Sequence, residues 1–145
     1  LGANLGLRYN DFYVSMQING AFGHKIYNAT ALTYMNVGSL PFYNVMQDAP
    51  ARNIYDQTAT DYWLEKGDYI HVAYLNFGWM VPLKQTRYIR SLRLSFSINN
   101  LLTLTGYSGL TPMINSSIVG PTLGTDDKRS YPLYRSYALG VSIQF

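Results

Sequence analysis

The most regular pattern of apolar and polar positions lies at the end of the chain, in residues 134–145. Every second residue from Tyr137 to Phe145 is apolar, and the residues between them are small or polar and carry no charge. Successive side chains of a β-strand point to opposite faces of the sheet, so this period of two predicts a strand with one wholly apolar face. An uncharged second face is typical of a strand that lies between lipid and a crowded, hydrated interior.

The same alternation recurs in four earlier stretches, so the sequence predicts five antiparallel strands. They are expected to span residues 1–9, 12–22, 69–81, 91–105 and 134–145. Asn10 and Asp11 have the composition of a two-residue hairpin turn. In 69–81 an unbroken alternation assigns the odd-numbered residues, His71 among them, to the apolar face. Near Asn100 the alternation slips, which indicates a β-bulge.

Two connections are short and two are long. Residues 23–68 and 106–133 lack strand alternation, although residues 28–37 favour a short helix, and connections of this length are usually functional or disordered. Barrels of the bacterial outer membrane have short periplasmic turns and long extracellular loops. The order of lengths therefore predicts that 23–68 and 106–133 are extracellular, whereas Asn10-Asp11 and residues 83–90 are periplasmic.

Charged residues avoid the predicted strands. Only 13% of the residues are charged, about half of the roughly 25% in an average protein. Arg135, at a loop-side end, is the one charge on the predicted apolar faces, and Arg8 and Arg93 are the charges on the opposite faces. A charge in the middle of a bilayer costs roughly 2–4 kcal/mol, so exposure to lipid explains this distribution. The predicted fold class is all-β, a transmembrane antiparallel β-barrel.

Five strands are too few for a closed barrel in a membrane, which needs about eight or more. An open sheet edge in lipid leaves backbone groups without hydrogen-bond partners. We therefore expect the chain to complete its barrel with other strands. The absence of cysteine excludes disulfides and thiolate zinc sites within these residues.

Four stretches resemble the carboxy-terminal end of SusC/RagA-type TonB-dependent outer-membrane receptors. LEKGDYIHVAYLNFGWMVP resembles the strand of this family that opens with an acidic-Gly-Ser-Tyr-Leu-Arg pattern, and LRLSFSINNLLTLTGYSGLTP resembles its Tyr-Ser-Gly-x-Asp-Pro segment. The last strand, YPLYRSYALGVSIQF, and the first hairpin, LGLRYNDFYVSMQINGAFGHKIYN, also match its patterns. The chain departs from the family at His71, where Arg is usual, at Leu102, where an aromatic is common, and at Thr111 to Met113.

The resemblance implies the last five strands of a 22-stranded barrel in the outer membrane, with an amino-terminal plug that these residues do not include. It implies import of a bulky nutrient, an oligosaccharide or an oligopeptide, with energy from TonB through a segment that is absent here. A SusD-like surface lipoprotein would act as a lid. The remaining barrel strands, the plug and the lipid bilayer are the other expected partners, and neither enzymatic chemistry nor a cofactor is implied.

Two sets of side chains on the strands have expected roles in the membrane. Tyr9, Phe12, Trp79 and Tyr88 fall near the predicted periplasmic boundary, with Phe145, and would form an interfacial aromatic girdle. The apolar series of the last strand resembles the terminal signal that outer-membrane barrel assembly machinery reads. Its members are Tyr137, Leu139, Val141, Ile143 and Phe145.

The long loops carry the candidate ligand-binding residues. Tyr55, Tyr62, Trp63 and Tyr107 are aromatic loop residues that could stack on sugar or peptide ligands, although packing of the loops against the lipoprotein partner is the more frequent use of such residues. His24 and His71 lack metal-ligand spacing, and Asp126-Asp127 lacks the regular oxygen spacing of a calcium loop.

The short link 83–90 is basic, with Lys84, Arg87 and Arg90. A basic rim that meets anionic lipid head groups explains it more simply than nucleic acid does. A second function class stays open at this point: a soluble or surface-exposed β-sandwich that binds glycans through the same tyrosine-rich loops.

Overall fold

The computed structural model describes residues 1–83, 88–114, 124–128 and 131–145. Lys84 and Arg87 of the basic link lie outside the described residues. The chain forms two compact units, which are described separately below. The first, called the sheet unit, consists of residues 1–21, 69–104 and 133–145, and the second, called the loop unit, consists of residues 22–68 and 105–132.

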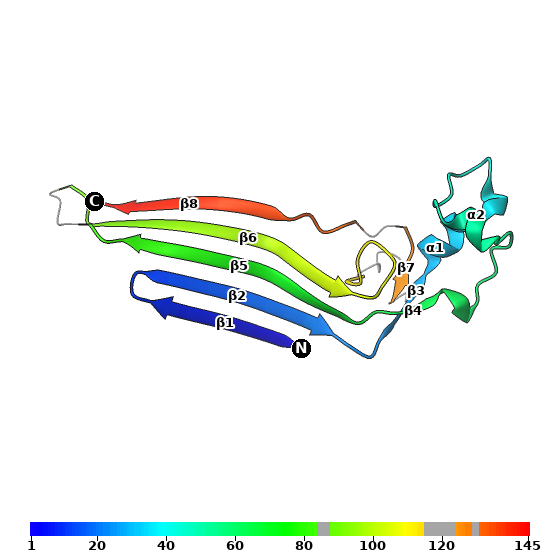
Figure 1. Ribbon diagram of the computed structural model, residues 1–145, viewed down its shortest axis with the longest axis horizontal. Helices are drawn as coiled ribbons and strands as arrows, with labels where there is room; N and C mark the ends of the chain where they lie inside the picture. The colour runs from blue at the N-terminus through cyan, green and yellow to red at the C-terminus, as the bar shows by residue number, and fades with distance from the viewer. Residues whose placement is uncertain (84–87, 115–123, 129–130) are drawn as a thin grey trace. The chain divides into compact units, whose positions relative to one another are not determined.

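The sheet unit is one five-stranded antiparallel sheet in which each strand lies beside the next one in the unit (Figure 1). Its strands are β1 (Gly2–Tyr9), β2 (Phe12–Ala21), β5 (Tyr69–Val81), β6 (Ser91–Thr105) and β8 (Ser136–Gln144). These bounds lie within two residues of the ranges expected from the alternation. An up-and-down order with short turns at one end is the arrangement of a barrel wall.

The first hairpin has the predicted two-residue turn. Tyr9 and Phe12 are paired across it, and Asn10 adopts a positive φ of 51°, which asparagine tolerates better than most residues. The backbone N–H of Met80 in β5 donates to the carbonyl of Asp11 over 2.7 Å. The turn is therefore fixed to the end of the third strand of the sheet.

A bulge in β5 corrects the predicted facing of its first half. Met16 of β2 pairs with Leu75, but Ile18 pairs with Val72, so the β5 side of the ladder contains one extra residue at this point. An extra residue reverses which side chains point to each face. The assignment of His71 to the apolar face was wrong, as was that of Tyr69, which pairs with Ala21 on the opposite face.

The structure gives a consistent position for His71 on the polar face. Its side chain is 4% exposed, its Cα pairs with that of Asn19, and its Nδ1 lies 2.9 Å from Oγ1 of Thr103 in β6. The even-numbered Ile70 and Val72 take its place on the apolar face. Unbroken alternation in the sequence gave no sign of this change.

In β6 the irregularity expected near Asn100 is present. Asn100 has a positive φ of 52°, and its side-chain amide donates to the carbonyl of Tyr134 over 3.0 Å. The ladder between β6 and β8 runs up to the pair Asn99 and Ser136. The irregular backbone at Asn100 thus lies beside the point where β8 separates from β6.

The loop unit has a fold of its own. A small three-stranded sheet has the order β4 (Leu64–Lys66), β3 (Lys25–Asn28), β7 (Thr125–Asp126), in which β3 is antiparallel to β4 and parallel to β7. The helical segments are α1 (Ala29–Tyr34), η1 (Val37–Ser39), α2 (Ala49–Arg52) and η2 (Asp61–Trp63). The short helix expected within residues 28–37 is α1.

The local sequence explains where these short helices begin and end. The side chain of Asn28 accepts a hydrogen bond from the N–H of Ala31 over 2.8 Å and so caps α1. Pro50 stands in the first turn of α2, where its missing N–H costs nothing, and Asn53 ends this helix in the left-handed conformation. In the described part of the chain, no helix is long and apolar enough to cross a bilayer.

The described residues of the loop unit contain a buried core. Its apolar members are Ile26, Ala31, Ala49, Trp63 and Tyr107. Several polar residues are buried with them, which are Asn28, Asn36, Ser39, Thr111 and Asp126. Buried polar side chains require hydrogen-bond partners, and those partners come from both long connections, as described next.

Candidate functional site

The sheet unit presents an apolar face on which the large side chains are exposed or half-buried and none is fully buried. Rows of paired side chains cross it, such as Leu7, Val14 and Phe77 in the first three strands. In the last two strands Leu94 pairs with Val141. The described strands carry no charged residue on this face, and Leu139 in β8 is 85% exposed. Exposed apolar surface of this extent marks an interaction site.

One end of this face is aromatic. Phe12 stacks on Trp79 with ring centroids 5.8 Å apart and an interplanar angle of 14°, and Tyr9 pairs with Phe12. Tyr88 and Phe145 are exposed and close in sequence to the ends of β6 and β8. The turn of the first hairpin and the carboxy terminus lie at this end (Figure 1). The position of these rings at one end of the apolar face suits an interfacial girdle, which stays a prediction.

The terminal series lies on the same face. Tyr137, Leu139, Val141 and Ile143 pair with Ile98, Phe96, Leu94 and Leu92 of β6. The rings of Phe96 and Tyr137 stack with centroids 6.3 Å apart. All four side chains of the β8 series are exposed, as is Phe145. Recognition of this series by assembly machinery stays a prediction.

The opposite face of the sheet unit is small and polar. Asn76 donates to Ser15, and Asn99 donates to Ser136 over 3.1 Å. Tyr13 lies over Gly78, where a Cβ atom would overlap its ring. On this face Arg93 lies 5.9 Å from the centre of the Tyr13 ring, within reach of a cation–π contact.

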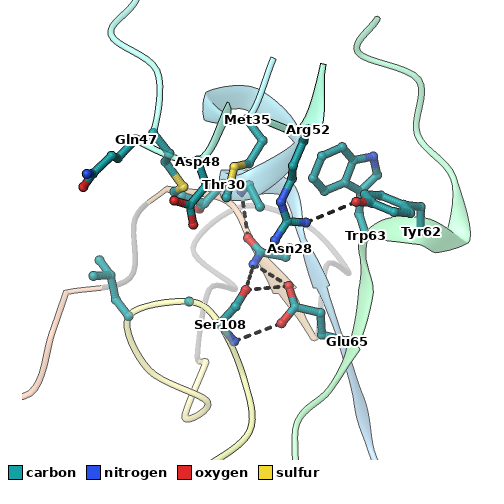
Figure 2. A pocket seen from close by; sticks show the side chains of 14 residues that line it. Asn28, Thr30, Met35, Gln47, Asp48, Arg52, Tyr62, Trp63, Glu65 and Ser108 are labelled. Carbon is teal, nitrogen blue, oxygen red and sulfur yellow. Dashed lines mark hydrogen bonds between the residues drawn. The ribbon is translucent and has the colours of Figure 1, made fainter. Parts of the chain in front are cut away.

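In the loop unit, a hydrogen-bond network joins the two long connections. The side-chain amide of Asn28 donates to Glu65 over 2.9 Å, and Glu65 also accepts from the backbone N–H and the hydroxyl of Ser108 (Figure 2). Burial raises the pKa of Glu65, but these hydrogen bonds and the nearby positive charge of Arg52 outweigh it, and the pKa is lowered from 4.5. Glu65 is therefore ionised at neutral pH.

A second network is buried. The hydroxyl of Tyr107 donates to the carboxylate of Asp126 over 2.7 Å, and Thr30 donates to the same carboxylate over 3.0 Å. Burial, followed by the hydrogen bond to Asp126, raises the pKa of Tyr107 far above its ordinary value. Asp126 is thus a structural residue of the loop unit.

The four aromatic loop candidates have different positions. Tyr107 is 6% exposed and its hydroxyl is bound to Asp126, so the structure corrects its expected use as a stacking surface: it is a core residue. Trp63 is 4% exposed and also belongs to the core, whereas Tyr62 is 58% exposed and lines a cavity with it. Tyr55 is exposed. A ligand role for Tyr62 and Tyr55 stays a prediction.

Sequence reasoning did not select the polar residues of this cavity. They include Asp48 and Arg52 of the α2 segment. Asp48 immediately precedes α2 and Arg52 is its last residue. Because the sequence did not predict this helix, it gave no sign that the two side chains line the same cavity.

The exposed, uncharged apolar face and the up-and-down order define the class of protein: the sheet unit is a segment of a membrane β-barrel wall. Five strands leave the barrel open, as expected for a part of one.

Comparisons with known proteins agree with this class. No family model matches the chain. The chain is 28% identical over 162 aligned positions to TonB-dependent receptor P3 of Formosa agariphila, an alignment that covers 100% of this chain and 16% of the receptor. It also superposes on solved structures of the RagAB peptide importer in the closed-closed and open-open states, with TM-scores of 0.77 and 0.75. These matches have 19% identity and cover 99% of this chain and 17% of the solved chain.

The resemblance to TonB-dependent receptors of the RagA type is therefore confirmed. The chain spans only about a sixth of the length of these relatives, which is consistent with the carboxy-terminal part of such a receptor. The barrel fold class predicted from the alternation is confirmed as well.

Proposed function

We propose that this chain supplies barrel strands and extracellular loops to a TonB-dependent importer in the outer membrane. The cargo is a bulky nutrient, an oligosaccharide or an oligopeptide. The observation that carries the proposal is the apolar face, which is free of charge in all five described strands and on which no large side chain is fully buried. Lipid provides a solvent for such a face, and water does not.

The β-sandwich alternative requires two sheets that bury an apolar core between them. In the described strands of the sheet unit, the buried positions are Gly20, His71 and Gly78. None of these is a large apolar residue, so this sheet has no sandwich core. Similarity to a TonB-dependent receptor over the whole chain supports the importer further.

A SusD-like surface lipoprotein is part of the proposal. The loop unit exposes a cluster of apolar side chains that its own core does not use: Leu40, Phe42 and Tyr43, of which Phe42 is 84% exposed. Large exposed aromatic side chains are typical anchors of protein interfaces. This cluster is a suitable contact for the lipoprotein.

The proposal is tested on the full-length protein in its native cells. We expect it in the outer-membrane fraction, released by detergent and not by salt or high pH, and we expect nutrient uptake to stop when the proton-motive force is dissipated. Release of the protein into buffer without detergent, or uptake that continues without the proton-motive force, would contradict the importer.

Association with the lipoprotein is measured by affinity purification in mild detergent. Phe42→Ser is expected to reduce co-purification of a surface lipoprotein, because it removes an exposed anchor. Tyr131→Ser changes another exposed aromatic residue of the loop unit, one that is neither in the cluster nor among the aromatic candidates, and serves as the matched control. Equal recovery with both variants would remove the cluster from the interface.

A further inference from the structure

The loop unit contains a cavity of about 610 Å³, a size in the range of small-molecule sites. Its walls come from β3, α1, α2 with the residues just before it, η2, β4 and the residues after β6 (Figure 2). A second cavity of about 370 Å³ shares three of its lining residues, Arg52, Tyr62 and Trp63. The shared wall is therefore accessible from two cavities.

The side chains of this wall hold one another in place. Trp63 is 4% exposed and belongs to the core. Tyr62 packs edge-on against it, with ring centroids 4.9 Å apart and an interplanar angle of 87°. The hydroxyl of Tyr62 accepts a hydrogen bond from Nη1 of Arg52 over 3.1 Å. The guanidinium is thus fixed through Tyr62 to a rigid residue, which lowers the entropy cost of binding a ligand.

Most of the donors of Arg52 are available. A guanidinium has five N–H groups, and within the described residues the side chain of Arg52 donates only to Tyr62. Arg52 is exposed, and Figure 2 shows its side chain extending among the lining residues between Asn28 and Tyr62. Planar guanidinium groups bind carboxylates through two parallel hydrogen bonds.

Two carboxylates also line the cavity, and they differ in what they do. Both oxygens of Glu65 accept hydrogen bonds from Ser108, and Asn28 donates to it as well, so this group is occupied within the loop unit. Asp48 stands four residues before Arg52 and is exposed. No ion pair joins Asp48 to Arg52 in the described chain. The positive charge of Arg52 acts on Glu65 through space and helps to lower its pKa, but the described side-chain hydrogen bond of Arg52 goes to Tyr62, so its other donors are left for a ligand.

We propose that Arg52 binds a carboxylate of the imported nutrient, with Tyr62 as its positioning residue and Asp48 as a group that limits the affinity. This inference rests on the proposed import function and adds a chemical class to its cargo. A carboxylate can come from the free end of an oligopeptide or from a uronic-acid unit of an oligosaccharide. Recognition of the carboxylate is the shared chemistry, and the experiment separates the two sources.

The experiment measures binding of defined probes to the purified full-length receptor in detergent by calorimetry. The peptide arm compares N-acetyl-pentaalanine with a free carboxylate and the same peptide as its amide. The sugar arm compares trigalacturonate with its methyl ester. We expect the free acid to bind in one arm and its neutral counterpart to bind at least about tenfold more weakly, because the charge-assisted hydrogen bonds are lost.

Variants then assign the effect to Arg52. Arg52→Gln is expected to weaken binding of the acidic probe by about tenfold or more, and Tyr62→Phe is expected to weaken it by about threefold. Asp48→Asn is expected to strengthen binding of the acidic probe by about two- to fivefold, because it removes a carboxylate that repels the carboxylate of the probe. Lys66→Gln removes one positive charge from the same unit outside both cavities, and we expect a change of less than about twofold.

The inference is overturned if neither free acid binds to the receptor, if acidic and neutral probes bind equally, or if Arg52→Gln and Lys66→Gln have the same effect. Opposite signs for Arg52→Gln and Asp48→Asn are the result that a general loss of structure would not produce. Outer-membrane location and uptake driven by the proton-motive force are measured separately, so failure of carboxylate binding leaves the import function standing.

Discussion

The sheet unit and the loop unit place their apolar residues in opposite ways. In the described sheet, large apolar side chains such as Leu139 and Val141 are exposed and only His71 and two glycines are buried. In the loop unit, Ile26 and Trp63 are buried together with polar residues such as Asn28 and Asp126. The loop unit therefore folds as a water-soluble protein does, around its own core, whereas the sheet is built for a solvent that accepts apolar side chains.

The largest expected effect is a loss of stability in the loop unit, caused by a substitution in its core. Trp63→Ala removes its largest buried side chain, and such changes cost about 3–5 kcal/mol. We expect much faster amide hydrogen exchange in residues 22–68 and 105–132 of the full-length protein. The sheet unit should keep its protection, because it does not rely on that core.

Tyr55→Ala is the control for this prediction, since Tyr55 is an exposed aromatic residue of the same unit. Its effect on exchange should be small. If Trp63→Ala and Tyr55→Ala raise exchange equally, the loop unit has no core of its own.

A charge on the apolar face gives the next largest effect. Leu139→Arg places an arginine near the middle of β8, where exposure to lipid costs roughly 2–4 kcal/mol. We expect a lower yield of heat-modifiable, folded barrel in the outer membrane. Ala138→Arg introduces the same residue one position away, on the polar face, and should be tolerated better. Equal yields would show that the two faces meet the same solvent.

The extent of sequence prediction differs between the units for a physical reason. In the sheet each strand is encoded by its own period of two, so β1, β2, β5, β6 and β8 follow from local sequence. The bulge in β5 was missed because Tyr69 to Val81 alternates without interruption, and only the pairing with β2 reveals the extra residue.

The loop unit depends on contacts between distant residues. Tyr27 of β3 pairs with Thr125 of β7, and Asn28 hydrogen-bonds Ser108, which lies 80 residues away. No local period encodes such contacts. The sequence consequently identified Tyr62 and Tyr107 as aromatic loop residues but gave no means to tell the exposed one from the buried one.

The smallest expected effect concerns pH. The pKa of Glu65 is lowered in the folded loop unit by the donors Ser108 and Asn28, so its ionised form stabilises the fold. This contribution is present above the ordinary value of 4.5 and is lost as the pH falls through the lowered pKa. We expect limited proteolysis of the long loops to accelerate as the pH is lowered below that value.

Glu65→Gln provides the comparison, because glutamine does not titrate in this range. Its proteolysis should depend less on pH than that of the unmodified protein. A parallel pH dependence in both proteins would assign the effect to other carboxylates.

The central claim, that the apolar face of the sheet meets lipid, is tested most directly by a spin-label scan. The chain contains no cysteine, so single cysteines are placed in turn along β8 and β5 of the full-length protein in lipid bilayers, with any cysteine elsewhere in the protein replaced. Collision of each label with oxygen, which concentrates in lipid, is measured against collision with a water-soluble nickel complex.

In β8 we expect high oxygen collision at Leu139, Val141 and Ile143 and low values at the residues between them. In β5 the maxima should fall at Leu75 and Phe77 and, beyond the bulge, at the even-numbered Val72 and Ile70. A flat profile, or maxima at the small and polar residues of β8, would contradict the account.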